Sequence, residues 1–289
     1  MFPIIGIVLL FALVFGSFLI SGGNMAVIIE ALPHEMMCIA GAGVAAFLIS
    51  NSMDVIKATG GGFSKVFGGP KWKAGDYRDL LSLLFLLTKT MKSKGVIALE
   101  SHIERPGEST IFSRYPNIMK DHFAVDFICD TLRMMTMNLE DPHQVEDAME
   151  KQLEKHHHEA VAPSAALQTT ADGLPALGIV AAVLGVIKTM GSITEPPAVL
   201  GAMIGGALVG TFLGVFLAYG LVGPMASRMK AVVEEEASFY RIIQAVLVAH
   251  LHGNAAQISV EIGRGNVPSA AQPSFLELEE ALGAIPNEP

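Results

Sequence analysis

The chain has 289 residues, of which 51% are hydrophobic and only 16% are charged. These values are typical of a membrane protein that also has a substantial water-soluble part. The net charge of −9 argues against nucleic-acid binding, which requires a basic face, so we expect no nucleic-acid partner.

Four apolar stretches, taken in chain order, predict four membrane-spanning helices in the lipid bilayer. They cover residues 4–20, 36–50, 173–191 and 198–223, and no Asp or Glu lies inside any of them. The first has no basic residue before it and no clear cleavage site after it, which favours a retained helix over a signal peptide. A protein that moves protons or cations unaided usually holds a carboxylate within a span. We therefore expect a partner to supply that carboxylate.

Basic residues predict the orientation of these spans. Fourteen of the nineteen Lys and Arg residues lie in 51–171, four more follow the last apolar stretch, and residues 21–35 contain none. Because Lys and Arg are enriched in cytoplasmic loops, we expect both termini and the central segment to lie in the cytoplasm.

The central segment is predicted to be helical. Apolar residues recur at helical spacing over 79–91 and again over 121–137. Glycines in 60–69 predict a break, as do Pro106 and Pro116. No alternating strand pattern is present, so the predicted fold class is an all-α integral membrane protein with four transmembrane helices and a large helical cytoplasmic domain.

Two helical segments are predicted after the last span. Residues 225–252 continue the fourth span, while Ser274 and Glu277 have the spacing of a capping box that begins a helix. The predicted division of the chain is 1–52 for transmembrane helices 1 and 2, 53–171 for the cytoplasmic helical domain, 172–224 for transmembrane helices 3 and 4, and 225–289 for the C-terminal cytoplasmic helical region.

Small residues and prolines mark the last two spans. Gly206, Gly210 and Gly214 recur every four residues on one face, where they allow close approach of another helix within the subunit or in a neighbouring subunit. Pro175 and Pro224 lie at the cytoplasmic ends of the third and fourth spans. They either mark helix ends or kink both helices at one membrane level to form a hinge.

Several segments match one protein family in the same register. They are GSFLISGG at 16–23, AGAG at 40–43, LPALGIVAAV at 174–183, VGTFLG at 209–214, AYG at 218–220 and PSF at 273–275. Through them almost the whole chain resembles the MotA family of flagellar motor stator subunits, which is related to the ExbB and TolQ proton-channel subunits.

The resemblance implies an assembly and a function. Family members form a homo-oligomeric ring, expected to be a pentamer, in the bacterial inner membrane. The ring surrounds a MotB partner whose single transmembrane helix carries the ion-binding Asp. Ion flow moves the ring, which then turns the flagellar rotor.

The resemblance also implies site residues. The family prolines linked to ion-coupled movement correspond to Pro175 and Pro224. Its charged pair that engages the rotor corresponds to Lys92 and Glu100. Lys92 stands where the best-known members have Arg, and lysine keeps the charge but lacks the planar fork of arginine. The neighbouring lysines at 89 and 94 are therefore alternatives for that role.

The transported ion is predicted to be the proton. Sodium-type relatives carry a hydroxyl on the third span where this chain has Ala182, which leaves the hydroxyl of Thr211 on the fourth span. Hard cations such as sodium require several oxygen ligands, so a single hydroxyl and a partner carboxylate favour proton transfer through water. The alternative for Thr211 is a hydroxyl bonded back to its own helix.

Two competing functions remain open. An ExbB/TolQ-like subunit energising another envelope process usually has fewer spans, and a stand-alone solute transporter needs internal repeats or polar groups at mid-membrane. Nucleotide-binding, nucleophile and zinc motifs are missing, so we expect no enzyme activity, no catalytic residue and no cofactor. We also expect no metal site, because the three adjacent histidines at 156–158 point in different directions on a helix.

Overall fold

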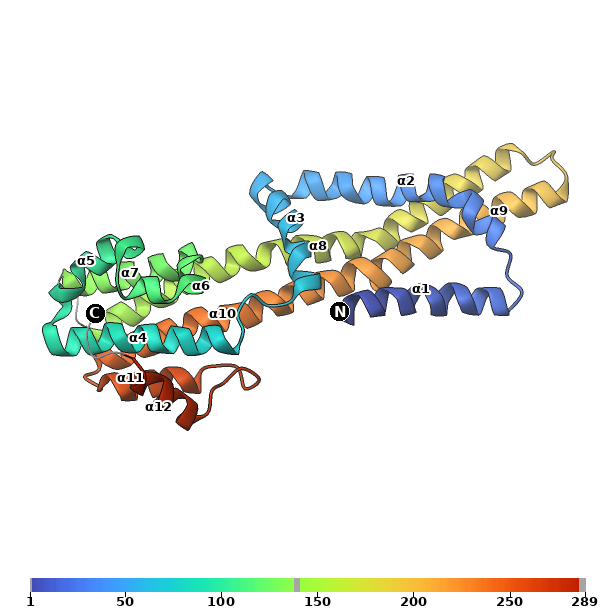
Figure 1. Cartoon of the computed structure of the whole chain (residues 1–289). Coiled ribbons are helices and arrows are strands. Elements are labelled where there is room, and N and C mark those ends of the chain that lie inside the picture. The colour runs from blue at the N-terminus through green and yellow to red at the C-terminus, as the bar shows by residue number, and fades with distance from the viewer. Residues whose placement is uncertain (1, 138–140, 286–289) are drawn as a thin grey trace. The chain divides into compact units, whose positions relative to one another are not determined.

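The computed structural model describes residues 2–137 and 141–285, and every regular element in these ranges is a helix (Figure 1). The first seven α-helices are α1 Phe2–Ile20, α2 Met25–Ser50, α3 Met53–Gly68, α4 Ala74–Lys94, α5 Glu100–Glu104, α6 Pro116–Met119 and α7 His122–Thr136. The others are α8 Pro142–Gly191, α9 Pro197–Val215, α10 Gly223–Leu251, α11 Ala256–Gly265 and α12 Phe275–Gly283. Short 3₁₀ turns cover Val96–Leu99, Pro106–Glu108 and Phe112–Arg114, and a π-helix covers Phe216–Val222. The all-α fold is as predicted.

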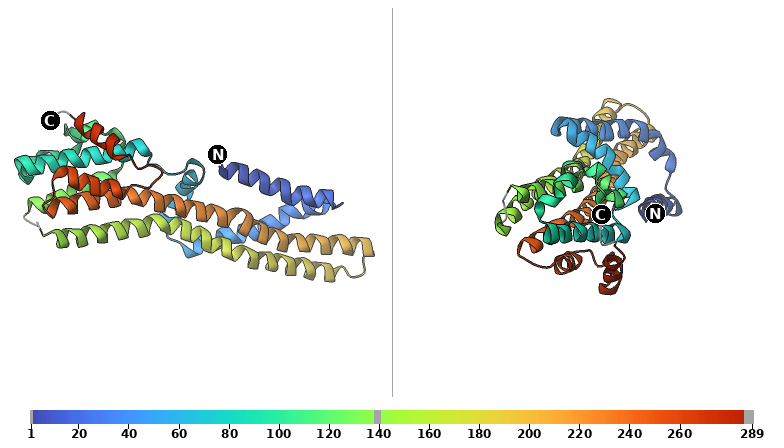
Figure 2. Two further views of the ribbon diagram at one scale, coloured as in Figure 1. Left: turned by 90° about the horizontal axis from the view of Figure 1, so that it is seen from below. Right: turned by 60° about the vertical axis from the view of Figure 1, so that its left-hand side comes forward.

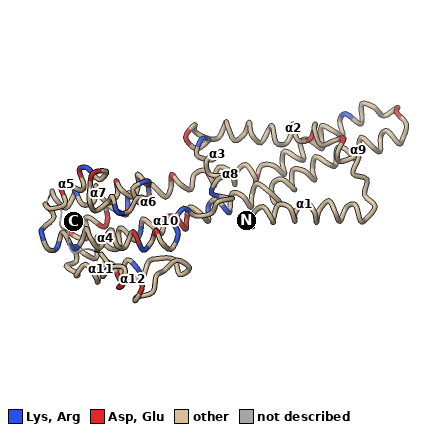
Figure 3. The backbone as a smooth tube through the Cα atoms, viewed as in Figure 1, with Lys and Arg blue, Asp and Glu red and all other residues tan. Residues whose placement is uncertain are grey.

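The chain forms two compact units. The membrane unit comprises Met1–Gly69 and Ala160–Val232, and the soluble unit comprises Pro70–Glu159 and Val233–Pro289. Lys, Arg, Asp and Glu are concentrated in the soluble unit and sparse along α1, α2 and α9 (Figure 3). The helices α8 and α10 each contribute residues to both units.

Four helices are long and apolar enough to cross a membrane, as the sequence predicts. They are Phe2–Ile20, Met25–Ser50, Pro142–Gly191 and the continuous helical stretch Pro197–Leu251. Large apolar side chains on the first of them are exposed, including Leu13 at 68% and Ile20 at 90%. Such exposure is unfavourable in water but natural against lipid.

Inside the membrane unit, α8 and α9 run side by side (Figure 2). α2 packs on α9, where Gly205 and Gly206 lie against Val27 and Ala31. α1 packs on the end of α9 and the π-helix through aromatic rings, with the ring centroids of Phe11 and Phe216 5.3 Å apart.

The start of α2 differs from the sequence prediction. The helix begins at Met25, eleven residues before the predicted span, and the Asn24 side chain caps it by accepting a hydrogen bond from the Ala26 N–H at 3.0 Å. Glu30 and Glu35 therefore lie within a candidate spanning helix, ahead of the predicted span at 36–50, so the absence of carboxylates holds for residues 36–50 but not for the whole of α2. The polar residues interrupt the hydropathy signal, whereas the cap and the packing against α9 stabilise the helix.

The predicted break at residues 60–69 is wrong over 60–68, where the glycines lie in α3, and holds only at Gly69, which ends the helix. A side-chain carbon at Gly62 would lie 2.7 Å from the sulfur of Met229, so the glycine allows α3 to pack closely on α10. Val66 is buried in the same contact. The helix ends only at Gly69, whose φ of 78° lies in the left-handed region. Here tertiary packing outweighs the weak helix propensity of glycine.

The soluble unit has its own hydrophobic core, built around α4. Leucines on several faces of α4 are completely buried, including Leu80, Leu84 and Leu87. α7 begins next to the predicted start at residue 121, with Asp121 as its cap. The capping box at Ser274 and Glu277 begins α12 as predicted, with N–H to side-chain oxygen distances of 2.7 and 3.2 Å.

Asp121 joins three segments of the soluble unit. Its carboxylate accepts hydrogen bonds from the Ala124 N–H at 2.8 Å, the Lys71 ammonium at 2.8 Å and the Tyr240 hydroxyl at 3.0 Å. Burial disfavours the ionised form, but the bonds from Lys71, Ala124 and Tyr240 outweigh burial and lower the pKa of Asp121 from its ordinary value. The carboxylate is therefore ionised at neutral pH.

Candidate functional site

A seam of small residues joins α8 and α9. We define the α8–α9 seam by Gly178, Ala181 and Gly185 on α8 and Ala207, Gly210 and Gly214 on α9. A side-chain carbon at Gly178 would lie 2.9 Å from the Gly210 carbonyl oxygen, and one at Gly214 would lie 2.7 Å from the Leu174 carbonyl oxygen. The two backbones are thus in direct contact, as the glycine spacing predicts, and no larger residue fits.

Ala182 and Thr211 border this seam. Ala182 follows the buried Ala181, Thr211 follows the buried Gly210, and both residues are half-buried in the single subunit. The Thr211 hydroxyl forms no hydrogen bond with any described residue, whereas the Thr189 hydroxyl donates to the Gly185 carbonyl at 2.9 Å. The alternative of a back-bonded Thr211 is therefore not observed, and its hydroxyl is available to water or an ion.

Pro175 and Pro224 lie within helical backbone rather than at helix ends. Pro175 is inside α8, where its missing N–H leaves the Ala171 carbonyl without its usual helical donor. Pro224 lies in the first turn of α10, directly after the π-helix. A side-chain carbon at Gly223 would lie 4.0 Å from Cβ of Ala171, so the backbone irregularities caused by the two prolines adjoin each other.

The π-helix was missed by sequence reasoning. Pro224 cannot donate to the carbonyl four residues earlier, and the Gly223 N–H instead bonds the Ala218 carbonyl five residues earlier. π-helical segments are rare and often occur at functional sites. The combination of Pro224 with Gly220 and Gly223 is the signal that could have indicated it.

Lys92 and Glu100 lie at one end of the soluble unit. Lys92 is in the last turn of α4, Glu100 begins α5, and both are exposed. Gly95, with φ of 82°, and the 3₁₀ turn Val96–Leu99 connect the two helices. The Lys92 ammonium donates to the Gly253 carbonyl at 3.2 Å, so it also ties α4 to the turn after α10.

Two other polar residues have structural explanations. Asp172 lies inside α8, where its carboxylate accepts a hydrogen bond from the Gln168 side chain at 2.8 Å. His156 stacks on Phe123 with ring centroids 3.6 Å apart. No group of three or more His, Cys, Asp or Glu among the described residues could hold a metal ion.

The carboxylate of Glu35 lies against the α8–α9 seam, and the sequence analysis did not identify it as a site residue. Glu35 extends from α2 so that a side-chain carbon at Gly210 would lie 2.5 Å from its Oε2. The available signal was helical spacing, since Glu35 lies one turn before the fully buried Ile39.

Two family models match the chain. The model described as Motility protein A N-terminal matches residues 4–95, and the MotA/TolQ/ExbB proton channel family matches residues 120–241. Motility protein A of Escherichia coli (strain K12) is 38% identical over 99% of this chain and 97% of that protein. Chemotaxis protein LafT of Vibrio parahaemolyticus is 34% identical over 96% of this chain and 97% of that protein.

Two solved structures have a similar fold. The C. jejuni MotAB structure matches with a TM-score of 0.72 and 19% identity, covering 94% of this chain and 98% of that chain. The flagellar MotAB stator complex from Bacillus subtilis matches with a TM-score of 0.67 and 23% identity, covering 89% of this chain and 92% of that chain. At these identities the two structures support the fold.

Proposed function

The chain belongs to the Motility protein A family, and from this we propose that it is a flagellar motor stator subunit. With a MotB-type partner it forms a proton channel that converts ion flow into torque on the flagellar rotor. The observation that carries the proposal is the full-length similarity to Motility protein A, which includes both the spans and the soluble unit. The ExbB/TolQ alternative would not account for the match of residues 4–95 to the Motility protein A N-terminal model.

The proposed assembly is a homo-oligomeric ring, a pentamer, in the bacterial inner membrane. It surrounds the partner's transmembrane helix, which supplies the ion-binding Asp. Both termini and the soluble unit lie in the cytoplasm, consistent with the distribution of Lys and Arg. The predicted division at residues 52, 171 and 224 then describes where the chain enters and leaves the membrane.

The proposed ion path runs along the rim of the α8–α9 seam. Ala182 offers no ligand there, and Thr211 offers one hydroxyl that is not bonded within the described chain. A single hydroxyl can orient water for proton transfer but cannot replace the hydration shell of a sodium ion. Protons are therefore the proposed ions.

The proposed coupling element consists of the two proline-induced irregularities. Pro175 and Pro224 leave helical carbonyls without their usual donors, and the Ala171 side chain lies 4.0 Å from where a side-chain carbon at Gly223 would be, so the two regions are near each other. A backbone with fewer internal hydrogen bonds changes shape at lower cost than a regular helix. Movement at this level would pass through α8 and α10, which both continue into the soluble unit.

The proposed rotor contact is the exposed end of the soluble unit that carries Lys92 and Glu100. Opposite charges on the two partners would guide and hold such a contact. Lys92 retains two of its three N–H donors beyond the bond to the Gly253 carbonyl, so it can still engage an acidic group.

The experiment is complementation of a strain from which the gene for this chain has been deleted. The intact gene should restore swimming, a protonophore should abolish it, and replacing external sodium with potassium should leave it unchanged. An empty vector is the negative control. Failure to restore swimming despite normal membrane levels and a retained partner gene would contradict the stator assignment. Speed that follows external sodium at fixed membrane potential would contradict only the choice of ion.

A further inference from the structure

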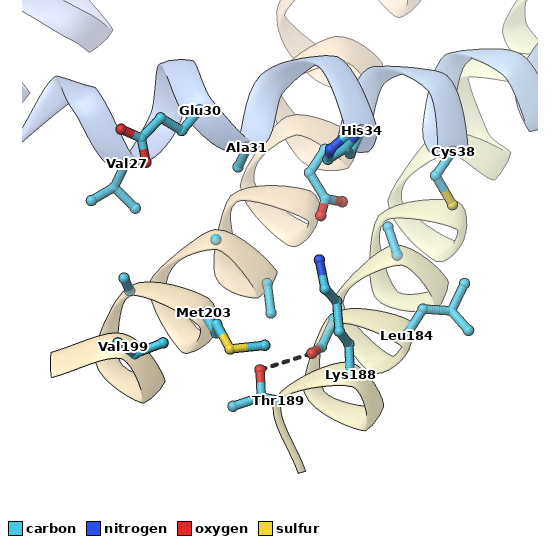
Figure 4. A pocket seen from close by; sticks show the side chains of 16 residues that line it. Val27, Glu30, Ala31, His34, Cys38, Leu184, Lys188, Thr189, Val199 and Met203 are labelled. Carbon is cyan, nitrogen blue, oxygen red and sulfur yellow. Dashed lines mark hydrogen bonds between the residues drawn. The ribbon is translucent and has the colours of Figure 1, made fainter. Parts of the chain in front are cut away.

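A cavity of about 490 Å³ lies between α2, α8 and α9 of the membrane unit (Figure 4). Lys188 extends from α8 into this cavity toward α2 (Figure 4). Within the described lining, α9 contributes no titratable side chain; those from α2 and α8 are Glu30, His34, Glu35, Cys38 and Lys188. The cavity is thus a polar recess among apolar helices.

The Glu35 carboxylate belongs to the lining of the recess. Gly210 provides the space for it, because any side-chain carbon there would lie 2.5 Å from Glu35 Oε2 and 3.1 Å from Cβ of Ala181. This oxygen is shielded from solvent and has no hydrogen-bond partner in the described chain. Glu35 forms no ion pair with Lys188 or any other described residue.

A carboxylate oxygen that is shielded from solvent and has no hydrogen-bond partner is unfavourable unless a cation or a proton binds to it. Burying an ionised carboxylate without a partner is costly, and ionisable groups inside membrane helices usually belong to ion pathways. His34 and Lys188 line the same recess, but neither donates a hydrogen bond to Oε2 in the described chain. A proton on the oxygen satisfies the site directly and fits the small space.

We propose that Glu35 is a proton-binding site carried by this subunit itself, loaded from the recess and positioned against the α8–α9 seam at Gly210, the residue before Thr211. The inference rests on the proposed stator function and deepens it. Glu35 accepts a proton from a hydronium ion in the recess, leaving water and a neutral carboxylic acid. It then returns the proton to water on the Thr211 side of the seam. Each subunit thereby collects protons for the partner's carboxylate.

The first test compares torque in the complemented deletion strain. Glu35→Gln keeps the size of the side chain but cannot carry the proton, and a positioned proton-transfer group contributes about 100-fold or more in rate, so we expect at least a tenfold loss of torque at normal membrane levels. Glu35→Asp should retain part of it. The control is Glu195→Gln, an exposed carboxylate in the connection between α8 and α9. Wild-type torque in Glu35→Gln would overturn the proposal.

The second test reads protonation directly. A hydrophobic carbodiimide reacts with protonated carboxylic acids, so mass spectrometry of the stator complex should find the adduct on Glu35 and not on Glu195, with less adduct as pH rises. Lys188→Gln should preserve both the adduct and the membrane level. The proposal fails if Glu35 of the unmodified chain forms no adduct and if Glu35→Gln and Lys188→Gln lower the membrane level equally. Glu35 would then be a structural group. Loss of complementation by the unmodified chain would refute the stator assignment instead.

Discussion

Replacing Gly214 with alanine tests how tightly α8 and α9 depend on each other. The added methyl carbon would lie 2.7 Å from the Leu174 carbonyl oxygen, 2.9 Å from Cα of Gly178 and 3.1 Å from its nitrogen. Ordinary van der Waals contact begins at 3.4 Å, so α8 must retreat by about 0.7 Å at the closest atom. All three neighbours are backbone atoms, so no side chain can rotate away. Overpacking of this kind costs about 1–3 kcal/mol in the free energy of unfolding.

The assay is the thermal unfolding midpoint of the detergent-solubilised protein, with swimming speed measured in the complemented deletion strain. Gly201→Ala is the matched control, because Gly201 lies on the same helix and has nothing within 4 Å of an added carbon. Alanine there should be neutral or stabilise the helix by up to about 1 kcal/mol. Gly214→Ala should unfold at a lower temperature than Gly201→Ala and swim more slowly. Equal midpoints would refute the reasoning, since the seam would then relax at no cost.

Three further predictions concern other parts of the molecule. Reversing the charge at Lys92 or Glu100 should reduce torque at unchanged membrane levels, because exposed charges contribute only about 0–1 kcal/mol to folding; unaltered torque in both variants would remove the rotor assignment. Thr211→Val should slow the motor and Thr211→Ser should not, whereas equal speeds would place the hydroxyl outside the ion path. Asp121→Ala should lower the free energy of unfolding by about 1–3 kcal/mol in chemical denaturation at pH 7. Because the folded pKa of Asp121 is lowered, its contribution is complete above the unfolded pKa of about 4 and is lost as pH falls through the folded value. A difference from wild type that does not diminish as the pH falls below about 4 would contradict that account.

Local signals in the sequence were sufficient for much of the fold. The capping box at Ser274 and Glu277 begins α12, and the predicted helix at 121–137 begins with Asp121 as its cap. Each of these features depends on residues within one or two turns of each other. An apolar run long enough to cross a bilayer is likewise a property of one contiguous segment. The glycine spacing around Gly210 likewise predicted close packing of the spans, because small residues at that interval share one helix face.

The candidate site was only partly predictable. The sequence indicated Pro224 as a coupling residue but not the π-helix before it, whose register depends on how the helix continues after the proline. It indicated Thr211 as an ion-path residue but left open a bond to its own helix, which depends on the side-chain rotamer adopted in the packed structure. The described chain leaves that hydroxyl unbonded.

Only the tertiary structure decided where the membrane helices begin and which polar groups they carry. Hydropathy placed the start of the second span at residue 36 because Glu35 and Glu30 interrupt the apolar run, yet α2 begins at Met25 and packs along α9. The glycines in 60–69 predicted a break, yet the helix continues to Gly68 and Gly62 allows α3 to pack on Met229. In both cases the helix packs against a segment that is distant in the sequence. A glycine at the contact has no side chain, and this allows the two helices to approach each other. Sequence alone therefore determined the local helical elements. The packing of remote segments determined that Glu35 lies against Gly210. The sequence could not show this, because the stability of a buried polar group depends on neighbours that are far away in the chain.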